Sequence, residues 1–544
     1  MDAQAPVGRW GVDAGELDER TRAFVVQRLG APQIAPPAQM PAIAPARVPG
    51  AAWADIAPGV VIETDDATRA RHSRGMSYLD LLTWRMGSGA FSAVDAVAFP
   101  HNHNDVLALV QGCSREGVVV VPVGGGTSVT GGITHNDDAS DDRPVLAVSM
   151  AQMSALEDFD TESGIATVQA GITGPQLEQA LDGYTLGHFP QSWERASIGG
   201  YIAARSSGQS SGGYGRIEDM LVAATLATPI GTWQVGGYPA ASTGPDMRHV
   251  VLGSEGTLGV ITSAQVRVRP APTVREYAAA VLPLGSADDG FLPAMHLART
   301  LTRSPLRPTI MRVSDAAETQ ALLTMSTPTG IAGTLFSTYL RARRALPGAL
   351  VIFGWEGTDA SVVASARAFA RSVMGDAGGV WLGAGPGRSW ERGRFHGPHL
   401  RDALMDAGYL VETFETVARW SVLPHLHARL TEAAREALGE HSYVMAHISH
   451  TYETGASVYF TVLAGGWADP QTAASNWHQA KAAITAVLVE AGGALSHHHG
   501  IGRDHAPWLA EQLGPVGTVA LRALQASIDP HQVMNPGVLR AGQP

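Results

Sequence analysis

A short run of glycines and hydroxyl side chains is a first candidate for chemistry. Residues 118–132 read VVVVPVGGGTSVTGG: an apolar run predicts a buried strand that stops at Pro122, and the glycines and Thr127–Ser128 follow. Glycines let backbone N–H groups approach a ligand because no Cβ stands in the way, and successive N–H groups form an anion-binding concavity. The stretch predicts a pyrophosphate cradle, although a plain glycine-rich turn between strands would have a similar composition.

The common phosphate-binding loops do not fit this stretch. A Walker A loop would end in Gly-Lys-Ser/Thr, and no lysine is present here. A Rossmann fingerprint that began at Gly124 would need a glycine at the position of Val129. The predicted cradle therefore belongs to neither class.

Two groups of histidines could bind a metal or move protons. Neighbouring residues of an extended segment point to opposite sides, so the adjacent His497, His498 and His499 cannot all face one metal ion. A hydrogen-bonding and proton-handling role fits them better, and no metal site is predicted. His101 and His103 read as loop residues before a helix that Asn104 or Asp105 would cap.

Two residue types occur once each, and their scarcity excludes several kinds of chemistry. Cys113 is the only cysteine, so the chain alone cannot form a disulfide, a Cys₄ zinc site or an iron–sulfur cluster. It lies in an apolar helical pattern, where we expect a buried thiol. Lys481 is the only lysine, and Schiff-base chemistry would have to rest on it.

Composition bounds the class of protein. The chain has 544 residues, 45% of them hydrophobic, which is enough for several domain-sized units. Its net charge of −12 offers no basic domain for nucleic acid. No apolar run approaches the length of a membrane span, and the N-terminus lacks a secretory signal pattern. We expect a cytoplasmic protein with at most peripheral membrane contact, and a homodimer is compatible with the sequence.

The elements that must position these residues fall into two groups. Between 93 and 272, strand patterns at 97–100, 118–121, 145–149 and 165–170 alternate with helical patterns. Within that part, residues 187–217 are dense in glycine, serine and aromatic residues, which suits close approach to a flat, extended ligand. Between 273 and 485, amphipathic helices (286–303, 360–374, 423–438) interleave with strands (309–313, 349–354, 442–449, 457–463), which predicts an α+β unit with an antiparallel sheet.

Several ordered motifs resemble one family. PVGGGTS at 122–128, GITG at 171–174, GSEGTLGVIT at 253–262, SHHHGIG at 496–502 and MNPG at 534–537 resemble flavoproteins of the vanillyl-alcohol-oxidase type. Within them the chain is most similar to the alkyldihydroxyacetonephosphate (alkylglycerone-phosphate) synthases. The resemblance implies an α+β fold: a bipartite vanillyl-alcohol-oxidase/PCMH-type FAD-binding domain with an inserted α+β cap domain. It divides the chain into an N-terminal helical extension and linker (1–92), the FAD-binding domain (93–272), the cap domain (273–485) and a C-terminal segment that returns to the flavin (486–544).

The same resemblance implies FAD as the cofactor. No histidine or cysteine stands in the cradle to tether the flavin, so we expect non-covalent FAD. The residues that fall on FAD-lining segments of the family are Pro122, Val123, Gly124, Gly125, Gly126, Thr127, Ser128, Gln191, Ser192, Ser197, Ala204, Arg205, Ser206, Ser207, Glu255, Gly256, Thr257, Leu258, Gly259, Val260 and Ile261.

Catalytic roles also follow from the resemblance. Tyr459 matches the family's catalytic tyrosine, Arg401 its substrate-phosphate arginine and Arg312 a second active-site arginine, and residues 497–499 match its triple histidine. The implied reaction exchanges the acyl chain of an acyl-dihydroxyacetone phosphate for a fatty alcohol in ether lipid synthesis, through a transient flavin N5 adduct without net redox change. From the residues alone, Tyr459 could simply pack on a sheet, and either arginine could pair with a surface carboxylate.

Two departures from the synthase pattern keep other functions open. The synthases carry an aspartate where this chain has Gln191, and an amide cannot replace a carboxylate in proton transfer. Asn535-Pro536-Gly537 is instead the ending found in the D-lactate and glycolate dehydrogenase branch of the superfamily. The alternatives are a FAD-dependent dehydrogenase or oxidase of an anionic 2-hydroxy acid, and a flavin-binding protein that has lost catalysis.

Overall fold

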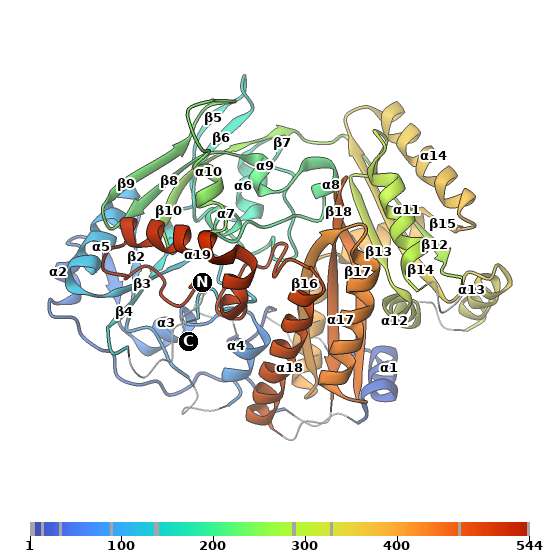
Figure 1. Cartoon of the computed structure of the whole chain (residues 1–544), viewed down its shortest axis with the longest axis horizontal. Helices are drawn as coiled ribbons and strands as arrows, with labels where there is room; N and C mark the ends of the chain where they lie inside the picture. The colour runs from blue at the N-terminus through green and yellow to red at the C-terminus, as the bar shows by residue number, and fades with distance from the viewer. Residues whose placement is uncertain are drawn as a thin grey trace.

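Four β-sheets organise the described chain, and they form two neighbouring regions (Figure 1). The computed structural model describes residues 6–11, 16–31, 35–86, 91–134, 141–285, 290–326, 330–465 and 469–540. One region carries sheets of four, five and two strands, and the other a single sheet of seven strands. The mixture of helices and largely antiparallel sheets confirms the predicted α+β class.

The four-stranded sheet holds the glycine stretch at its edge. Its order is β1 (Val61–Glu63), β2 (Ala96–Phe99), β4 (Val145–Ser149), β3 (Val119–Val123). The last three strands run parallel. The predicted strand end at Pro122 is wrong, because β3 continues to Val123. An edge strand tolerates a proline, which has no N–H to donate.

Helix α5 (His103–Glu116) connects β2 to β3. Its N-cap is Asn102, whose side chain accepts the N–H of Asp105, so the predicted caps Asn104 and Asp105 are wrong. The Asp105 carboxylate instead accepts the N–H of His101 at 2.9 Å, which closes the turn before the helix. Cys113 is fully buried on α5, as predicted, and burial raises the pKa of its thiol to about 12.

Antiparallel strands complete the first region. The five-stranded sheet has the order β5 (Leu156–Asp160), β6 (Ile165–Gln169), β10 (Val260–Arg267), β8 (Leu221–Thr228), β9 (Gly231–Gly236). A short pair joins β7 (Tyr184–Thr185) to β11 (Arg269–Pro270). The helices of this region are α6 (Gly174–Ala180), α7 (Ile198–Ala204), α8 (Ser211–Tyr214), α9 (Ile217–Met220) and α10 (Arg248–Val251). A hydrophobic core that includes Leu109, Leu146 and Ile202 lies between these sheets and helices.

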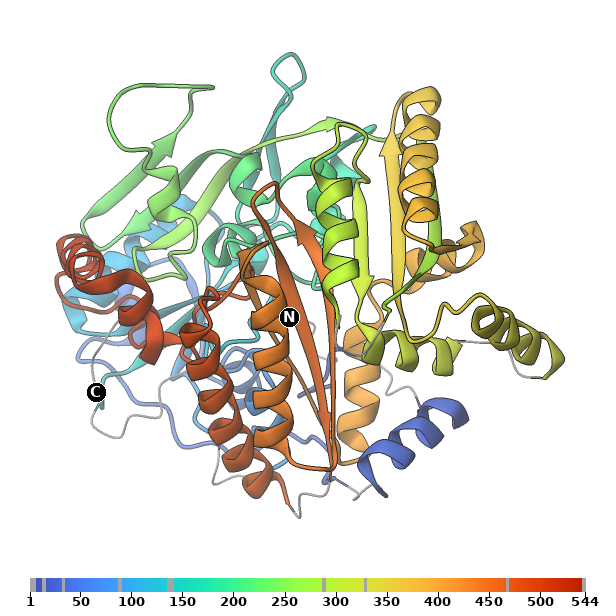
Figure 2. The same ribbon diagram turned by 45° about the vertical axis from the view of Figure 1, so that its right-hand side comes forward.

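The second region is one antiparallel sheet with helices on its outer face (Figures 1 and 2). The strand order is β15 (Val380–Gly383), β12 (Val274–Pro283), β14 (Gly348–Gly357), β13 (Ile310–Ser314), β17 (Ser442–Thr451), β18 (Gly455–Ala464), β16 (Leu410–Arg419). The outer helices, which pack into one large core with the sheet, are α11 (Leu292–Thr302), α14 (Ala360–Asp376), α17 (Leu423–Leu438) and α18 (Pro470–Glu490). Of the predicted helix 286–303, positions 286–289 lie outside the described residues.

The inner face and the ends of this sheet meet other parts of the chain. The elements concerned are α1 (Glu19–Leu29), α4 (Tyr78–Thr83), α12 (Ala316–Ser326), α15 (Ala384–Gly393) and α16 (Gly397–Asp406). Figure 2 shows α1, in blue, beside the seven-stranded sheet, and its residues Phe24, Val25 and Leu29 pack against Leu404 and Met445. The N-terminal extension therefore packs against the second region.

The C-terminal segment returns to the first region. After α18 the chain passes through the triple histidine into α19 (Leu509–Ile528), drawn in red across the first region in Figure 1. Val533 then accepts the N–H of Val120 in β3 at 2.8 Å, and Asn535 donates its N–H back to the Val120 carbonyl at 2.8 Å. The tail thus pairs with the strand that leads into the glycine cradle. The predicted domain boundaries remain predictions.

Candidate functional site

One cavity of about 640 Å³ joins the two regions, and most of the predicted site residues line it. That volume lies within the usual range for ligand sites. The predicted residues in its wall are Pro122, Gly124, Gly125, Gly126, Thr127, Ser128, Gln191, Ser192, Ser197, Ala204, Ser206, Ser207, Glu255, Gly256, Gly259, Val260, Ile261, Arg312, Arg401, Tyr459, His498 and His499. Five others lie outside the wall: Val123, Arg205, Thr257, Leu258 and His497.

The glycine cradle is fixed by close packing against the segment before α7. A Cβ on Gly125 would lie 2.0 Å from the carbonyl oxygen of Arg195, and one on Gly124 would lie 2.3 Å from Ser197 Oγ. The turn itself is held by Ser128, whose Oγ accepts the N–H of Gly132 at 2.9 Å. At Gly125 the obstacle is backbone, so only glycine fits, whereas a Cβ on Gly124 would require the Ser197 hydroxyl to move.

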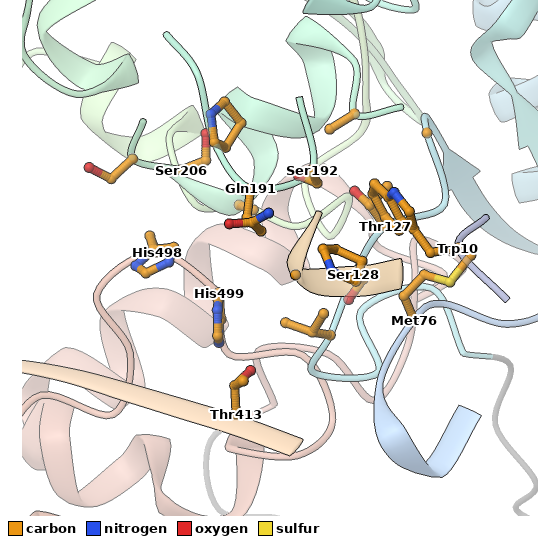
Figure 3. A pocket seen from close by; sticks show the side chains of 18 of the residues that line it. Trp10, Met76, Thr127, Ser128, Gln191, Ser192, Ser206, Thr413, His498 and His499 are labelled. Carbon is orange, nitrogen blue, oxygen red and sulfur yellow. The ribbon is translucent and has the colours of Figure 1, made fainter. Parts of the chain in front are cut away.

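Gln191 lies opposite the cradle. Figure 3 places its side chain between Thr127 and Ser128 on one side and His498 and His499 on the other. The Gln191 Oε1 accepts a hydrogen bond from Gln209 Nε2 at 3.2 Å. Where the resemblance implies a carboxylate, the structure therefore has a neutral amide within the cavity.

The seven-stranded sheet carries a row of polar side chains, of which Tyr459 and His447 line the cavity. Directly paired residues on neighbouring antiparallel strands project from the same face. Glu415 of β16 pairs with Tyr459 of β18, which pairs with His447 of β17, which pairs with Ser314 of β13. The rings of His447 and Tyr459 stack with centroids 5.1 Å apart. Burial raises the pKa of Tyr459 to about 12, so its phenol holds a proton at neutral pH.

Further along the same strands the wall becomes apolar. The next rows pair Thr413 with Thr461 and then Val411 with Leu463. Helices α1, α12 and α16 close this end of the cavity. The apolar arm, as we name this end, is lined by Phe24, Val25, Ala321, Leu322, Met325, Leu404, Val411, Met445 and Leu463.

The triple histidine is anchored by a single carboxylate. Glu415 accepts the backbone N–H groups of residues 497, 498 and 499 at 2.7–3.0 Å, together with Ser496 Oγ at 2.6 Å. Burial acts to raise the pKa of Glu415, but the adjacent histidines and the hydrogen bonds hold it well below its ordinary value. Glu415 therefore fixes the loop as an ionised group.

The histidine side chains form hydrogen-bonded pairs. His497 lies behind the wall, bonded through Nε2 to the hydroxyl of Tyr452 and through Nδ1 to His498 Nδ1 at 2.9 Å. Within the described residues, nitrogens of His450, His497 and His498 lie within 4.8 Å of one another. Ser207 and Ser211 lie at hydrogen-bond distance from His450 Nδ1, 3.1 and 2.8 Å away. Burial is the largest cause that lowers the pKa of each histidine, and the Glu415 carboxylate acts to raise it.

Both predicted substrate arginines reach the cavity. Arg401 donates from Nη1 to the Met76 carbonyl at 2.8 Å, and Arg312 donates from Nη2 to Glu318 Oε1 at 2.8 Å. In each, the Nε–H is buried and makes no hydrogen bond to the described part of the chain. Because both side chains line the cavity, their guanidinium groups suit an anionic group bound there.

No pattern in the sequence indicates the N-terminal contribution to the site. The backbone N–H groups of Trp10 and Gly11 donate to Asp402 Oδ2 at 2.7 and 3.0 Å, which brings the Trp10 ring into the cavity wall (Figure 3). The guanidinium of Arg195 lies 5.2 Å from that ring. The hydrogen bonds to Asp402 join residues nearly 400 positions apart in the chain, and no local pattern encodes them.

Comparison with known proteins identifies the family. A family model described as "FAD binding domain" matches residues 94–237, and one described as "FAD linked oxidases, C-terminal domain" matches residues 275–539. The chain is 33% identical to the alkyldihydroxyacetonephosphate synthase of Trypanosoma brucei brucei over 498 residues, which covers 89% of this chain and 79% of the relative. It belongs to the FAD-linked oxidase family.

Solved structures agree with this assignment. A structure of alkyldihydroxyacetonephosphate synthase superposes with a TM-score of 0.78 at 27% identity, covering 98% of this chain and 97% of the other. Substrate-bound p-cresol methylhydroxylase superposes with a TM-score of 0.65 at 13% identity, covering 97% and 98%, and shows the shared fold alone. The predicted vanillyl-alcohol-oxidase/PCMH-type fold is confirmed.

The residues of this FAD-linked enzyme fit the cofactor. One part of the cavity wall is formed by backbone and small side chains from Gly124–Ser128, from Gly199 and Gly200 and from Gly256. In this cradle, backbone N–H groups would hold the pyrophosphate and glycine or serine residues would lie against the flavin. The role of each individual residue stays a prediction.

Proposed function

We propose that this protein exchanges the acyl chain of an acyl-dihydroxyacetone phosphate for a fatty alcohol, as an alkylglycerone-phosphate synthase does. The observation that carries the proposal is the apolar arm. It continues the same cavity beyond Tyr459 and is walled by aliphatic and aromatic side chains from α1, α12, α16 and the sheet. A small 2-hydroxy acid would have no use for such an arm, whereas an alkyl chain would bury its methylenes there, at about 0.8 kcal/mol each.

The polar residues divide the remaining tasks. Arg401 and Arg312, whose side chains line the cavity, would bind the substrate phosphate through their guanidinium groups. Tyr459 holds a proton at its hydroxyl beside the reacting atoms, because burial raises its pKa to about 12. Bound FAD would supply the electrophilic ring that joins the two half-reactions. Trp10 and the α1 residues would keep water away from the lipid part of the site.

The test uses purified protein under anaerobic conditions with two sets of substrates. We expect a labelled long-chain fatty alcohol and acyl-dihydroxyacetone phosphate to give labelled ether product without an added electron acceptor. D-lactate and glycolate should leave the flavin spectrum unchanged. Bleaching of the flavin by either hydroxy acid, with electrons passed to a dye and no ether formed, would contradict the proposal.

A second candidate is oxidation of a 2-hydroxy acid. One observation in its favour is Gln191, which stands in place of the carboxylate that the synthases carry. The other is the Asn535-Pro536-Gly537 tail. There Asn535 Nδ2 donates to the carbonyls of Gly132 and Glu255 at 2.9 and 2.8 Å. In that case an arginine would bind the carboxylate and a histidine would take the hydroxyl proton. The anaerobic experiment above separates the two reactions.

We also propose that FAD is held without a covalent bond. The only cysteine is buried on α5 and takes no part in the wall, and no histidine lies in the cradle itself. Acid precipitation followed by filtration should release all of the yellow cofactor into the filtrate. Flavin that remains in the protein pellet after washing would contradict this.

A lipid substrate implies contact with a membrane surface, and we propose that α13 (Ile331–Ala342) provides it. Ile331, Leu335 and Tyr339 are 81%, 64% and 47% exposed, and their four-residue spacing places them on one face. Exposed arginines follow at 341, 343 and 344, which suits anionic lipid. No helix among the described residues is long and apolar enough to cross a bilayer.

Vesicle sedimentation tests this contact. Wild-type protein should sediment with vesicles that contain phosphatidylserine, and Leu335→Asn should weaken that binding by about tenfold, from the loss of one buried apolar side chain. Val516→Asn on α19 is the matched control, because Val516 is also 81% exposed. Equal loss in both variants, or binding by neither wild type nor variants, would count against α13.

A further inference from the structure

His447 is paired with a buried carboxylate, although neither residue stands out in the sequence. His447 Nδ1 lies 3.0 Å from Glu318 Oε1, and both side chains are almost completely buried. Glu318 is ionised, because burial, which acts to raise its pKa, is outweighed by Arg312 and His447, so that the pKa lies far below its ordinary value. An ionised carboxylate only accepts hydrogen bonds. Nδ1 of His447 therefore carries the proton, and Nε2 is left with its lone pair.

The free nitrogen belongs to a residue of the cavity wall. His447 and Glu318 both line the cavity, and Nε2 of His447 makes no hydrogen bond within the described residues. The ring is held flat against Tyr459 by the β17–β18 pairing. A carboxylate on one ring nitrogen and an open position at the other is the arrangement that makes an imidazole a general base.

The other histidines of the wall are arranged differently. His498 Nδ1 faces His497 Nδ1 and is 3.6 Å from Glu415, and His499 Nδ1 is 4.0 Å from it. Both contacts are too long for a hydrogen bond. His450 Nδ1 lies at hydrogen-bond distance from two serine hydroxyls. His447 is thus the wall histidine of the described chain with a carboxylate at hydrogen-bond distance.

Neither Gln191 nor Tyr459 can act as the general base of this site. Gln191 is neutral and cannot accept a proton in the relevant pH range. Tyr459 is protonated at neutral pH because of its raised pKa, so it cannot begin the reaction as the base. A group that is neutral and basic at the start is needed beside Tyr459, and His447 is in contact with it.

We propose that His447, oriented by Glu318, is a further catalytic residue that takes the hydroxyl proton of the incoming alcohol. The inference rests on the proposed function. The alcohol oxygen forms the new ether C–O bond as its proton passes to Nε2 of His447. The acyl group leaves as a carboxylate with the electron pair of the old C–O bond, and the proton on His447 returns to solvent. Glu318 acts through His447 and is a positioning residue.

The pH dependence has a definite sign. The groups that face His447 are Arg312 from β13, Asp315 and Glu318 at the start of α12, Tyr459 from β18 and His498 from the tail. Burial and then Arg312 lower the pKa of His447, whereas Glu318 and Asp315 raise it. Activity should fall as acid protonates the ring. Glu318→Gln removes a group that raises the pKa, so the acid limb should move to lower pH.

The test compares variants of the FAD-loaded enzyme in the exchange assay. His447→Gln should lower kcat by about 100-fold or more, with FAD content unchanged and KM for the phosphate substrate within about threefold of wild type, because Arg401 is intact. His447→Ala should regain activity when imidazole is added. Glu318→Gln should lower kcat and shift the acid limb. His478→Gln, an exposed histidine on α18, is the control and should behave as wild type.

Retention of most of kcat by His447→Gln would overturn the proposal. The proposal would also be overturned if His447→Ala lost activity and added imidazole did not restore it, while FAD content and the KM of the phosphate substrate stayed normal. That combination indicates a packing role for His447. Failure of the proposed function is seen separately, in the wild-type enzyme. If wild type oxidises a 2-hydroxy acid instead, the same variants are assayed on that reaction, where the hydroxyl proton needs the same acceptor.

Discussion

The two sides of the cavity are built in opposite ways. On the cradle side, Gly124, Gly125 and the turn held by Ser128 present backbone to the cofactor, and all of them lie in one stretch of chain. On the sheet side, Glu415, Tyr459 and His447 come from three strands and meet through strand pairing. The cradle side binds through exposed backbone, which requires residues without side chains. The sheet side acts through polar side chains, which requires that strand pairing direct them to the same face.

This difference predicts two kinds of damage. A change in the cradle should weaken binding of the cofactor, and with it every activity, whereas a change in the polar row should slow the reaction and leave the cofactor in place. The physical reason is that added atoms at Gly125 displace backbone, while removal of one polar atom from a buried row leaves the packing intact.

The largest effect is expected on the sheet side. Tyr459→Phe removes the buried hydroxyl and keeps the ring stacked on His447, so kcat should fall by about 10²–10⁴, with a normal flavin spectrum. Tyr238→Phe, at a side chain 69% exposed, is the matched control and should retain full activity. Full activity in Tyr459→Phe would remove this residue from the mechanism.

On the cradle side, Gly125→Ala should yield protein with little FAD. The added methyl would overlap the Arg195 carbonyl oxygen at 2.0 Å, and overpacking of this kind costs about 1–3 kcal/mol, roughly tenfold or more in FAD affinity. The ratio of flavin to protein absorbance measures it. Gly375→Ala in α14, where a Cβ meets nothing within 4 Å, is the control. Normal FAD content in Gly125→Ala would contradict a close-packed cradle.

A smaller effect should appear in the apolar arm. Phe24→Ala enlarges the arm, so the preferred alcohol should become longer, with a gain of about fourfold in kcat/KM for each methylene newly buried. A series of alcohols of increasing length measures this shift. Val26→Ala on the exposed side of α1, where Val26 is 38% exposed, should leave the preference unchanged. An unaltered profile in Phe24→Ala would place the alkyl chain elsewhere.

The smallest effect concerns stability and pH. Burial raises the pKa of Glu255 to about 7, against hydrogen bonds from the N–H groups of Ile501 and Gly502. A raised carboxyl pKa stabilises the fold at low pH, and that stabilisation is lost as pH rises through 7. The free energy of unfolding of wild type minus that of Glu255→Gln should therefore fall by about 1–3 kcal/mol between pH 5 and pH 8. Thermal unfolding at each pH measures this difference. A difference constant over this range would contradict the raised pKa.

The parts of the fold that are encoded locally were predictable. Strand and helix patterns predicted β13, β14, β17, β18, α14 and α17, and the glycine stretch predicted a turn that lines a ligand cavity. The cap of α5 was misplaced because Asn102, Asn104 and Asp105 are all suitable N-cap residues within one short polar run, and the structure shows Asn102 in the cap position. Pro122 was misread because the sequence does not show that β3 is an edge strand.

The sequence by itself determined the cofactor class, because several family motifs occur along it in order, whereas the glycine run alone predicted only a pyrophosphate cradle. It also contained Tyr459, Arg401 and the triple histidine, which family motifs locate one by one. Only the tertiary structure decided that Glu318 meets His447, that Glu415 anchors the histidine loop and that Trp10 and Phe24 enter the cavity wall. Each of these contacts depends on strand register or on the docking of distant segments, and no local spacing in the chain specifies either.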